Sequence, residues 1–219
     1  LNPNDANAYF QRGTTYLENG ANKHAIQDFE TAIKLNPQNA YTYLNHAAAK
    51  INIDDYNGVL FDYNKSIELD SSIYQSFVLR GGLKIEFKNY EGALTDFNKA
   101  IQLNPKDTLI YLQRGYLYEL MEDYSHALTD FNRIIAFNPK IPKAFSLRGW
   151  VKYKQHNYKE AINDYNKAIE LDPSRANCYC NRGHCKWELG DREGACSDFS
   201  IASKLGYKEA ENSLKLHCR

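Results

Sequence analysis

Prolines recur in this chain at a spacing of 34 residues. Five of the six prolines share one phase of that spacing, and Ser71 stands where the phase would place another. A fixed period of this length is typical of a repeat protein, in which each unit is one supersecondary element that packs on its neighbours. The period therefore constrains the architecture more tightly than any single motif. The five prolines are Pro3, Pro37, Pro105, Pro139 and Pro173.

Residue types recur at fixed positions within six segments of this length. The fourth and twenty-fourth positions are always aromatic, five of the six segments have Gly at the eighth, and five have Ala at the twentieth. Asp or Asn occupies the sixteenth position in five segments, where it predicts an N-cap for a second helix. Each segment is therefore expected to form a helix, a tight turn and a helix. The segments are 6–39, 40–73, 74–107, 108–141, 142–175 and 176–209.

This pattern resembles the tetratricopeptide repeat, whose signature is an early aromatic, a Gly, a later Ala, an aromatic and a closing Pro. The resemblance runs from Ala6 to about Glu209 in six copies. It implies an all-α fold, a right-handed α-solenoid or superhelix of helix-turn-helix repeats. Residues 208–219 are expected to form a C-terminal capping helix. Residues 1–5 match the closing stretch of a repeat, so we expect at least one further repeat upstream of them.

The charge balance argues against a nucleic-acid or lipid partner. Lys plus Arg and Asp plus Glu number 27 each, so the chain has no overall basic field for phosphates or an anionic membrane. No apolar run approaches the roughly 18 residues that a membrane-spanning helix needs. We therefore expect neither nucleic-acid binding nor direct membrane insertion.

The cysteines lie only near one end of the chain. An odd number of them, with none in the first five segments, is no disulfide framework, and it favours a reducing compartment and a cytoplasmic location. A single Cys196–Cys218 bridge, in an exported, periplasmic or anchored protein, is the alternative. The cysteines are Cys178, Cys180, Cys185, Cys196 and Cys218.

Catalytic and metal-binding patterns are weak. Cys180, His184 and Cys185 could share a helix face, but no orienting Asp or Asn, oxyanion turn or phosphate-binding glycine loop accompanies them. The cysteine spacing matches none of the common zinc motifs. We expect no enzyme activity, cofactor or metal in this chain, and interpret these residues as ordinary packing.

A charged pair recurs in every segment. Position seven is Arg in five segments and His46 in the second, and position twenty-three is Asp in all six. Residues that recur in every unit are better explained by a role in the unit than by one ligand. We expect an ion pair between the two helices, because a guanidinium fits a carboxylate bidentately. An anion-binding ladder of arginines is the alternative.

The second segment departs from the pattern at several positions together. Ala47 replaces Gly, Val59 and Ser66 replace Ala, Ser71 replaces Pro and His46 replaces Arg. The larger residues should push the two helices slightly apart. We therefore expect altered curvature or local mobility in this segment.

The resemblance also implies where a partner would bind, because the first helices of such repeats line a concave groove. That face is mostly apolar here, with small residues at the ninth position of the first three segments and rings in the last three. We expect a peptide or helix of a partner protein to bind there through apolar and aromatic contacts. The candidate binding residues are Phe10, Leu44, Asn45, Val78, Leu112, Gln113, Tyr116, Trp150, Tyr153, Asn181, His184 and Trp187.

Two binding modes known from related repeats fit these residues poorly. The Lys, Asn and Arg set with which co-chaperones of the family clamp an acidic C-terminal tail has no counterpart. The asparagine ladder of O-linked N-acetylglucosamine transferase is preserved only in part at the sixth position. That position holds Gln11, Asn45, Leu79, Gln113, Leu147 and Asn181.

The predicted function is a non-enzymatic scaffold or adaptor that binds a partner protein. Two alternatives stay open at this point. The repeats could be a regulatory or assembly arm of a longer enzyme or membrane-anchored protein, or they could be a self-association module.

Overall fold

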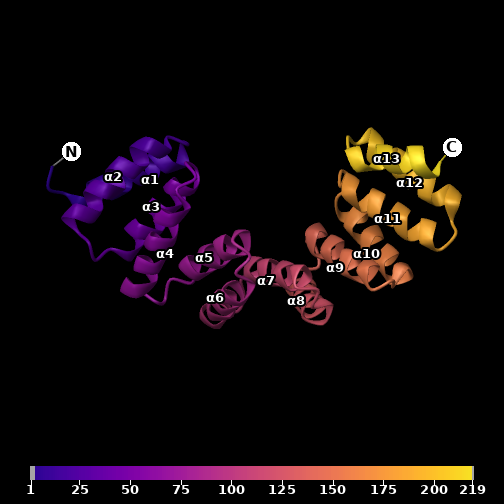
Figure 1. Cartoon of the computed structure of the whole chain (residues 1–219), viewed down its shortest axis with the longest axis horizontal. Helices are drawn as coiled ribbons and strands as arrows, with labels where there is room; N and C mark the ends of the chain where they lie inside the picture. Colours follow the sequence, from indigo (N-terminus) through magenta and orange to yellow (C-terminus); the bar gives the residue numbers. More distant parts are fainter. Residues whose placement is uncertain (1–2, 219) are drawn as a thin grey trace. The chain divides into compact units, whose positions relative to one another are not determined.

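Helices make up most of the computed structural model, which describes residues 3–218 (Figure 1). These residues form thirteen helices and no strand. The helices divide into two units, one ending at Pro105 and the other beginning at Lys106. The predicted all-α class of helical repeats is confirmed. Residues 1 and 2 of the predicted leading segment and residue 219 of the predicted cap lie outside the described residues.

The N-terminal unit contains three helix pairs, one in each of the first three segments. Within a pair the two helices pack against each other, and each pair packs on the next. The helices are α1 (Ala6–Glu18), α2 (Asn22–Leu35), α3 (Ala40–Ile51), α4 (Tyr56–Leu69), α5 (Tyr74–Glu86) and α6 (Tyr90–Leu103).

The C-terminal unit contains three further pairs and one additional helix. The additional helix, α13, packs on α12 at the end of the unit. The helices are α7 (Thr108–Leu120), α8 (Tyr124–Phe137), α9 (Pro142–Lys154), α10 (Tyr158–Leu171), α11 (Ala176–Glu188), α12 (Arg192–Lys204) and α13 (Lys208–His217). No helix among residues 3–218 is long and apolar enough to span a bilayer.

Side-chain caps begin most of the second helices, as their sixteenth-position residues predict. Asp55, Asn89, Asp123 and Asp191 each accept a hydrogen bond from the backbone N–H three residues later, at 2.9 to 3.2 Å. Asn157 makes no such bond at the start of α10. A second set of caps, which the sequence pattern did not predict, begins several first helices. These are Asp5, Asn39 and Asp107.

A glycine in five of the six first helices lets the aromatic ring of the second helix approach closely. At Gly115, an added Cβ would lie 2.6 Å from Cε1 of Phe131, which is far inside van der Waals contact. The rings at the twenty-fourth position are completely buried, so they have no room to move away. The glycine and the ring therefore fix the spacing of the two helices together. The buried rings are Phe29, Tyr63, Phe97, Phe131, Tyr165 and Phe199.

Arginine and aspartate join the two helices of a repeat, which confirms the predicted ion pair. In the fifth repeat, Nε and Nη2 of Arg148 donate to the two carboxylate oxygens of Asp164 at 2.9 and 2.5 Å. Lys152 adds a third contact to the same carboxylate at 2.7 Å, and the Asp164 side chain is 5% exposed. The other pairs are Arg12–Asp28, Arg80–Asp96, Arg114–Asp130 and Arg182–Asp198.

The same arginines also reach the preceding repeat, a contact that the sequence pattern did not predict. Nη1 of Arg148 donates to Oδ1 of Asn132 in α8 at 2.7 Å, so one guanidinium holds α8, α9 and α10. Arg80 and Arg182 make the equivalent bonds to Asn64 and Asn166, also at 2.7 Å.

Four of the five substituted residues of the second repeat lie in its core, and Ser71 is exposed. Ala47, Val59 and Ser66 are fully buried, and Oγ of Ser66 lies 2.8 Å from Oγ of Ser76 in the next repeat. The serine at position 66 therefore has a buried polar partner. The altered curvature and mobility expected for this repeat stay predictions.

A disulfide joins Cys196 in α12 to Cys218, directly after α13. The Cys196–Cys218 bridge, which the sequence left open as the alternative, is therefore present. The bond holds α13 against α12, where Ala210 and Leu214 pack on the core of the last repeat. Leu216, the other leucine of α13, is 77% exposed. The compartment of the protein stays a prediction.

Candidate functional site

Three adjoining hollows lie along α7, α9 and α11 in the C-terminal unit. Leu147 lines both the first and the second hollow, whereas Trp150, Asn181 and Tyr207 line both the second and the third. Because neighbouring hollows share lining side chains, we treat them as one surface, called here the C-terminal groove. Its lining residues are Leu112, Gln113, Tyr116, Lys143, Ser146, Leu147, Trp150, Tyr153, Asn177, Cys180, Asn181, His184, Tyr207 and Glu209.

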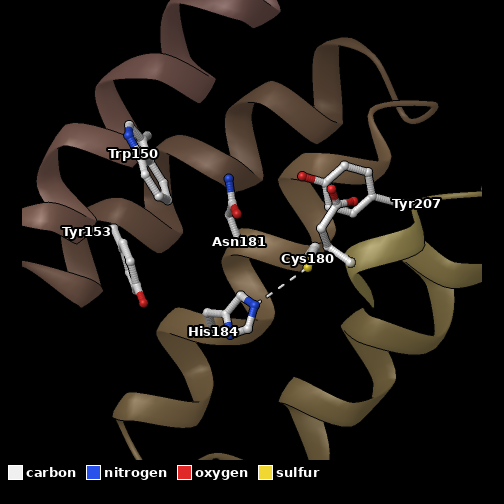
Figure 2. A pocket seen from close by; sticks show the side chains of 7 residues that line it. Trp150, Tyr153, Cys180, Asn181, His184 and Tyr207 are labelled. Atoms are coloured by element: carbon white, nitrogen blue, oxygen red, sulfur yellow. Dashed lines mark hydrogen bonds between the residues drawn. The ribbon is translucent and has the colours of Figure 1, made fainter. Parts of the chain in front are cut away.

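The third hollow, of about 260 Å³, is closed at one end by the residues that begin α13. Figure 2 shows Trp150 and Tyr153 from α9 on one side and Tyr207 on the other, with the amide of Asn181 between them. Tyr207 is the N-cap residue of α13, and Glu209 follows in its first turn. The groove therefore ends where α13 docks.

Seven of the predicted binding residues line the groove. Trp150, Tyr153, Asn181 and His184 line the third hollow, although they are widely separated in sequence. The first hollow is lined by Leu112, Gln113 and Tyr116.

Four predicted binding residues lie in the N-terminal unit and have local structural contacts. Leu44 is 8% exposed and belongs to the core of the second repeat, so it does not face an open groove. Phe10 packs on Phe29 with 6.1 Å between ring centroids. Nδ2 of Asn45 donates to Oγ1 of Thr14 at 3.3 Å. Val78 is half-buried in α5.

Trp187 is held by contacts at the C-terminal end of the unit and does not line the groove. The Arg192 guanidinium lies 3.5 Å from its ring centroid, and the His217 ring lies 4.2 Å away. His217 ends α13, so the docked helix covers the indole. Trp187 therefore contributes to the docking of α13, and its role as an anchor for a partner stays a prediction.

Trp150 is fixed in place before any partner arrives. Its indole Nε1 donates to Oε1 of Glu119 in α7 at 2.9 Å. The Tyr153 ring stacks on it with centroids 5.6 Å apart, and Nζ of Lys154 lies 5.2 Å from the ring centroid. A side chain held in this way loses little conformational entropy on binding, which favours it as an anchor.

The Cys180 and His184 pair has the distance of a catalytic dyad but not its electrostatics. Sγ of Cys180 lies 3.7 Å from Nε2 of His184, which also lies 3.3 Å from Oγ of Ser213. Burial raises the pKa of Cys180 to about 11, and it lowers the pKa of His184 together with the nearby charge of His217. The thiol is therefore protonated at neutral pH, whereas nucleophilic catalysis needs a thiolate.

Slow alkylation should follow from this burial. We expect iodoacetamide at pH 8 to modify Cys180 in the folded chain about a hundredfold more slowly than in the unfolded chain, since only the thiolate reacts. Raising the pH toward 11 should speed the reaction, because the thiolate fraction grows as the pH approaches the raised pKa. Mass spectrometry of peptides after timed quenching measures the rate, with urea-unfolded chain as the reference. Rapid alkylation at pH 8 would restore the catalytic interpretation.

The described residues were also compared with the requirements of a metal site. Among residues 3–218 no group of three or more His, Cys, Asp or Glu side chains is placed to hold a metal ion.

Tyr207 and Glu209 line the groove although neither was predicted, because both lie outside the first helices of the repeats. Their signal was the replacement of Leu-Asn-Pro by Leu205-Gly206-Tyr207, which marks the change from repeat to capping helix.

Family models for tetratricopeptide repeats match the chain in several places. A model described as TPR repeat matches residues 86–122 and 149–190. Two models described as tetratricopeptide repeat match residues 6–39 and 109–141. Together they cover more than half of the chain. No curated protein matches it.

Solved structures with the same fold are distant in sequence. YrrB, described as a TPR protein with an unusual peptide-binding site, is 23% identical with a TM-score of 0.70, over 85% of this chain and 97% of its own. PilF of Pseudomonas aeruginosa is 21% identical with a TM-score of 0.80, over 95% and 97%. A tetratricopeptide repeat protein of Parabacteroides merdae is 24% identical with a TM-score of 0.71, over 100% and 86%.

The residues that the family models match form helix pairs of the kind that the repeat is made of. Proteins built from these repeats generally bind other proteins and typically act as scaffolds. The chain belongs to the tetratricopeptide repeat family.

Proposed function

We propose that this chain is a non-enzymatic scaffold whose C-terminal groove binds a peptide segment of a partner protein. The observation that carries the proposal is that neighbouring hollows share lining residues, which makes the groove continuous. Leu147 and Trp150 link one hollow to the next, so an extended or helical segment could contact all three.

The groove offers two kinds of contact to a peptide. Tyr116, which is 43% exposed, and the fixed ring of Trp150 provide apolar anchors. The amides of Gln113 and Asn181 each offer a donor and an acceptor to the peptide backbone. YrrB, with the same fold, is described as having a peptide-binding site, which supports peptide binding as the class of function.

A selection from a library of random peptides tests the proposal. Phage-displayed peptides would be selected on the immobilised chain, and their affinities measured by fluorescence anisotropy. We expect Trp150→Ala to raise the dissociation constant of the selected peptides by about tenfold or more, as truncating an aromatic hot spot does. Asn181→Ala should also weaken binding, because backbone hydrogen bonds of the peptide would be lost.

Phe137→Ala serves as the matched control. Phe137 is an aromatic residue of the same unit that is 51% exposed and does not line the groove. Its substitution should leave the affinity unchanged. If peptides bind Trp150→Ala and Asn181→Ala as tightly as the unsubstituted chain, the groove is not the binding surface.

A further inference from the structure

The arginines of the repeats define a recurring guanidinium environment with three components. In the third repeat, Arg80 bonds both carboxylate oxygens of Asp96 and the amide oxygen of Asn64, and it lies over the Phe77 ring at 5.6 Å. Carboxylate, amide oxygen and ring recur around Arg148 and Arg182. Each component favours a cation: the carboxylate by charge, the amide oxygen as an acceptor and the ring by its π face.

The second repeat keeps the acceptors and the ring but has His46 in place of the arginine. Asp62 provides the carboxylate and Tyr43 the ring, while Glu30 occupies the position that holds Asn in the repeats just described. A hollow of about 480 Å³ opens at this place, between α2, α3 and α4. It is lined by Glu30, Ile33, Lys34, Tyr43, His46, Lys50, Phe61 and Asp62.

His46 is buried in the hollow without a full set of partners. The residue is 4% exposed, and Nδ1 lies 3.0 Å from Oδ2 of Asp62 but lacks the alignment of a hydrogen bond. Nε2 has no hydrogen-bond partner among the described residues. Buried polar atoms nearly always have a partner, so the unpaired imidazole does not replace the arginine as a hydrogen-bond donor to Asp62.

We propose that this hollow binds the guanidinium of an arginine side chain presented by a partner protein. The incoming guanidinium would take the place that the chain's own arginines occupy in the other repeats. Asp62 would accept a charge-assisted hydrogen bond, Glu30 would supply a second carboxylate, and Tyr43 would offer its ring face. Phe61, which is 57% exposed at the rim, would cover the apolar stem of the arginine.

The lysines of the hollow are compatible with a bound guanidinium. Lys50 pairs with Oδ2 of Asp62 at 3.0 Å. Lys84 and Arg80 share Asp96 in the same way, and so do Lys152 and Arg148 on Asp164. Both Lys50 and His46 contact Oδ2 of Asp62, whereas Oδ1 is the atom that accepts Nη2 of arginine in those repeats.

Lys34 is the one other cation of the lining, and it lies on the solvent side. It is an exposed residue of the last turn of α2, where its flexible stem lets the ammonium move into water. The two carboxylates of Glu30 and Asp62 balance the two ammonium groups, and the two rings then favour a planar cation over an anion.

A titration followed by NMR tests this site directly. The probe is N-acetyl-arginine methylamide, which presents the side chain as a protein would, and the matched control is N-acetyl-citrulline methylamide, which has nearly the same shape without the charge. We expect saturable shifts of the Tyr43 and His46 ring signals with the arginine probe. The citrulline probe should bind about tenfold more weakly or worse, because the charge-assisted hydrogen bonds are lost.

Two variants in the hollow and one control variant in the other unit locate the binding. His46→Arg should fill the hollow from within and abolish the shifts, and the exposed His156→Arg, in the other unit, should not. Glu30→Gln removes the exposed carboxylate without touching the core and should weaken binding about tenfold. Thermal unfolding followed by circular dichroism checks that each variant folds.

The outcomes separate the candidate ligands. Absent shifts with the arginine probe, or equal shifts in His46→Arg, would overturn the proposal. Equal binding of the citrulline probe would show a merely apolar pocket, and saturable binding of inorganic phosphate in place of the arginine probe would show an anion site. Binding of free arginine but not of the blocked probe would reject a protein side chain as the ligand.

Discussion

Asp164→Ala should lower the free energy of unfolding of the C-terminal unit by about 3 to 5 kcal/mol, the cost of leaving a partly buried charge without its partner. Arg148 and Lys152 would both lose their acceptor, and their side chains are only 20% and 22% exposed. Urea unfolding followed by circular dichroism at 222 nm measures the change. An aspartate that served an anion-binding ladder of arginines would cost far less stability when removed.

Glu170→Ala in the same helix is the control for the aspartate. Glu170 pairs with Lys167 at 2.7 Å, but its side chain is 65% exposed. Exposed pairs contribute little because water screens them, so we expect a change of about 0.5 kcal/mol or less. A similar loss of stability in both variants would mean that burial of the ion pair does not decide its contribution.

Gly115→Ala should be the next most destabilising change, with a cost of about 2 kcal/mol from overpacking. The added methyl group would lie 2.6 Å from Cε1 of Phe131, which is completely buried and cannot withdraw without moving α8 from α7. Ala is the better helix former, and this gain offsets only part of the strain. Urea unfolding with the same readout measures the difference.

Gly82→Ala, the same substitution at an uncrowded position, should instead raise the free energy of unfolding. An added Cβ at Gly82 meets no atom within 4 Å, so only the helix propensity changes. We expect a gain of about 0.5 to 1 kcal/mol in the N-terminal unit. If Gly115→Ala were also stabilising, the glycine would not be what sets the helix spacing.

The fold was largely predictable because the same residue types recur at the same positions in nearly every repeat. The pairing of Gly115 with Phe131 and of Arg148 with Asp164 occurs within one repeat, at separations that recur in five of the six repeats. Local patterns of this kind are readable from one sequence. The bond from Arg148 to Asn132 joins two repeats, and a pattern of positions within single repeats carries no signal for it.

The site was predictable only in part, because a position in the repeat does not determine exposure. Leu44 and Leu112 occupy the same position, yet Leu44 is buried in a core cluster and Leu112 lines the groove. Exposure depends on the size of side chains in adjacent repeats, which differ from unit to unit. The exposure of Trp187 and Tyr207 depends in addition on how α13 docks, and no repeated pattern describes that helix.

The shared guanidinium groups have a consequence for how a unit of this chain loses its structure. Arg148 is bonded to both α8 and α10, so melting of either neighbour would strand a donor and destabilise the repeat that remains. Such linkage raises the cooperativity of a repeat array, whose stability is otherwise a sum of units and their interfaces. Between the first two repeats His46 and Glu30 replace the linking pair, and the interface rests on apolar packing and on the bonds from Asn45 to Thr14 and from Asn52 to Asn22. That joint therefore lacks the arginine that links two helices of neighbouring repeats elsewhere, and we expect the first repeat to be less tightly coupled to the second through side-chain hydrogen bonds.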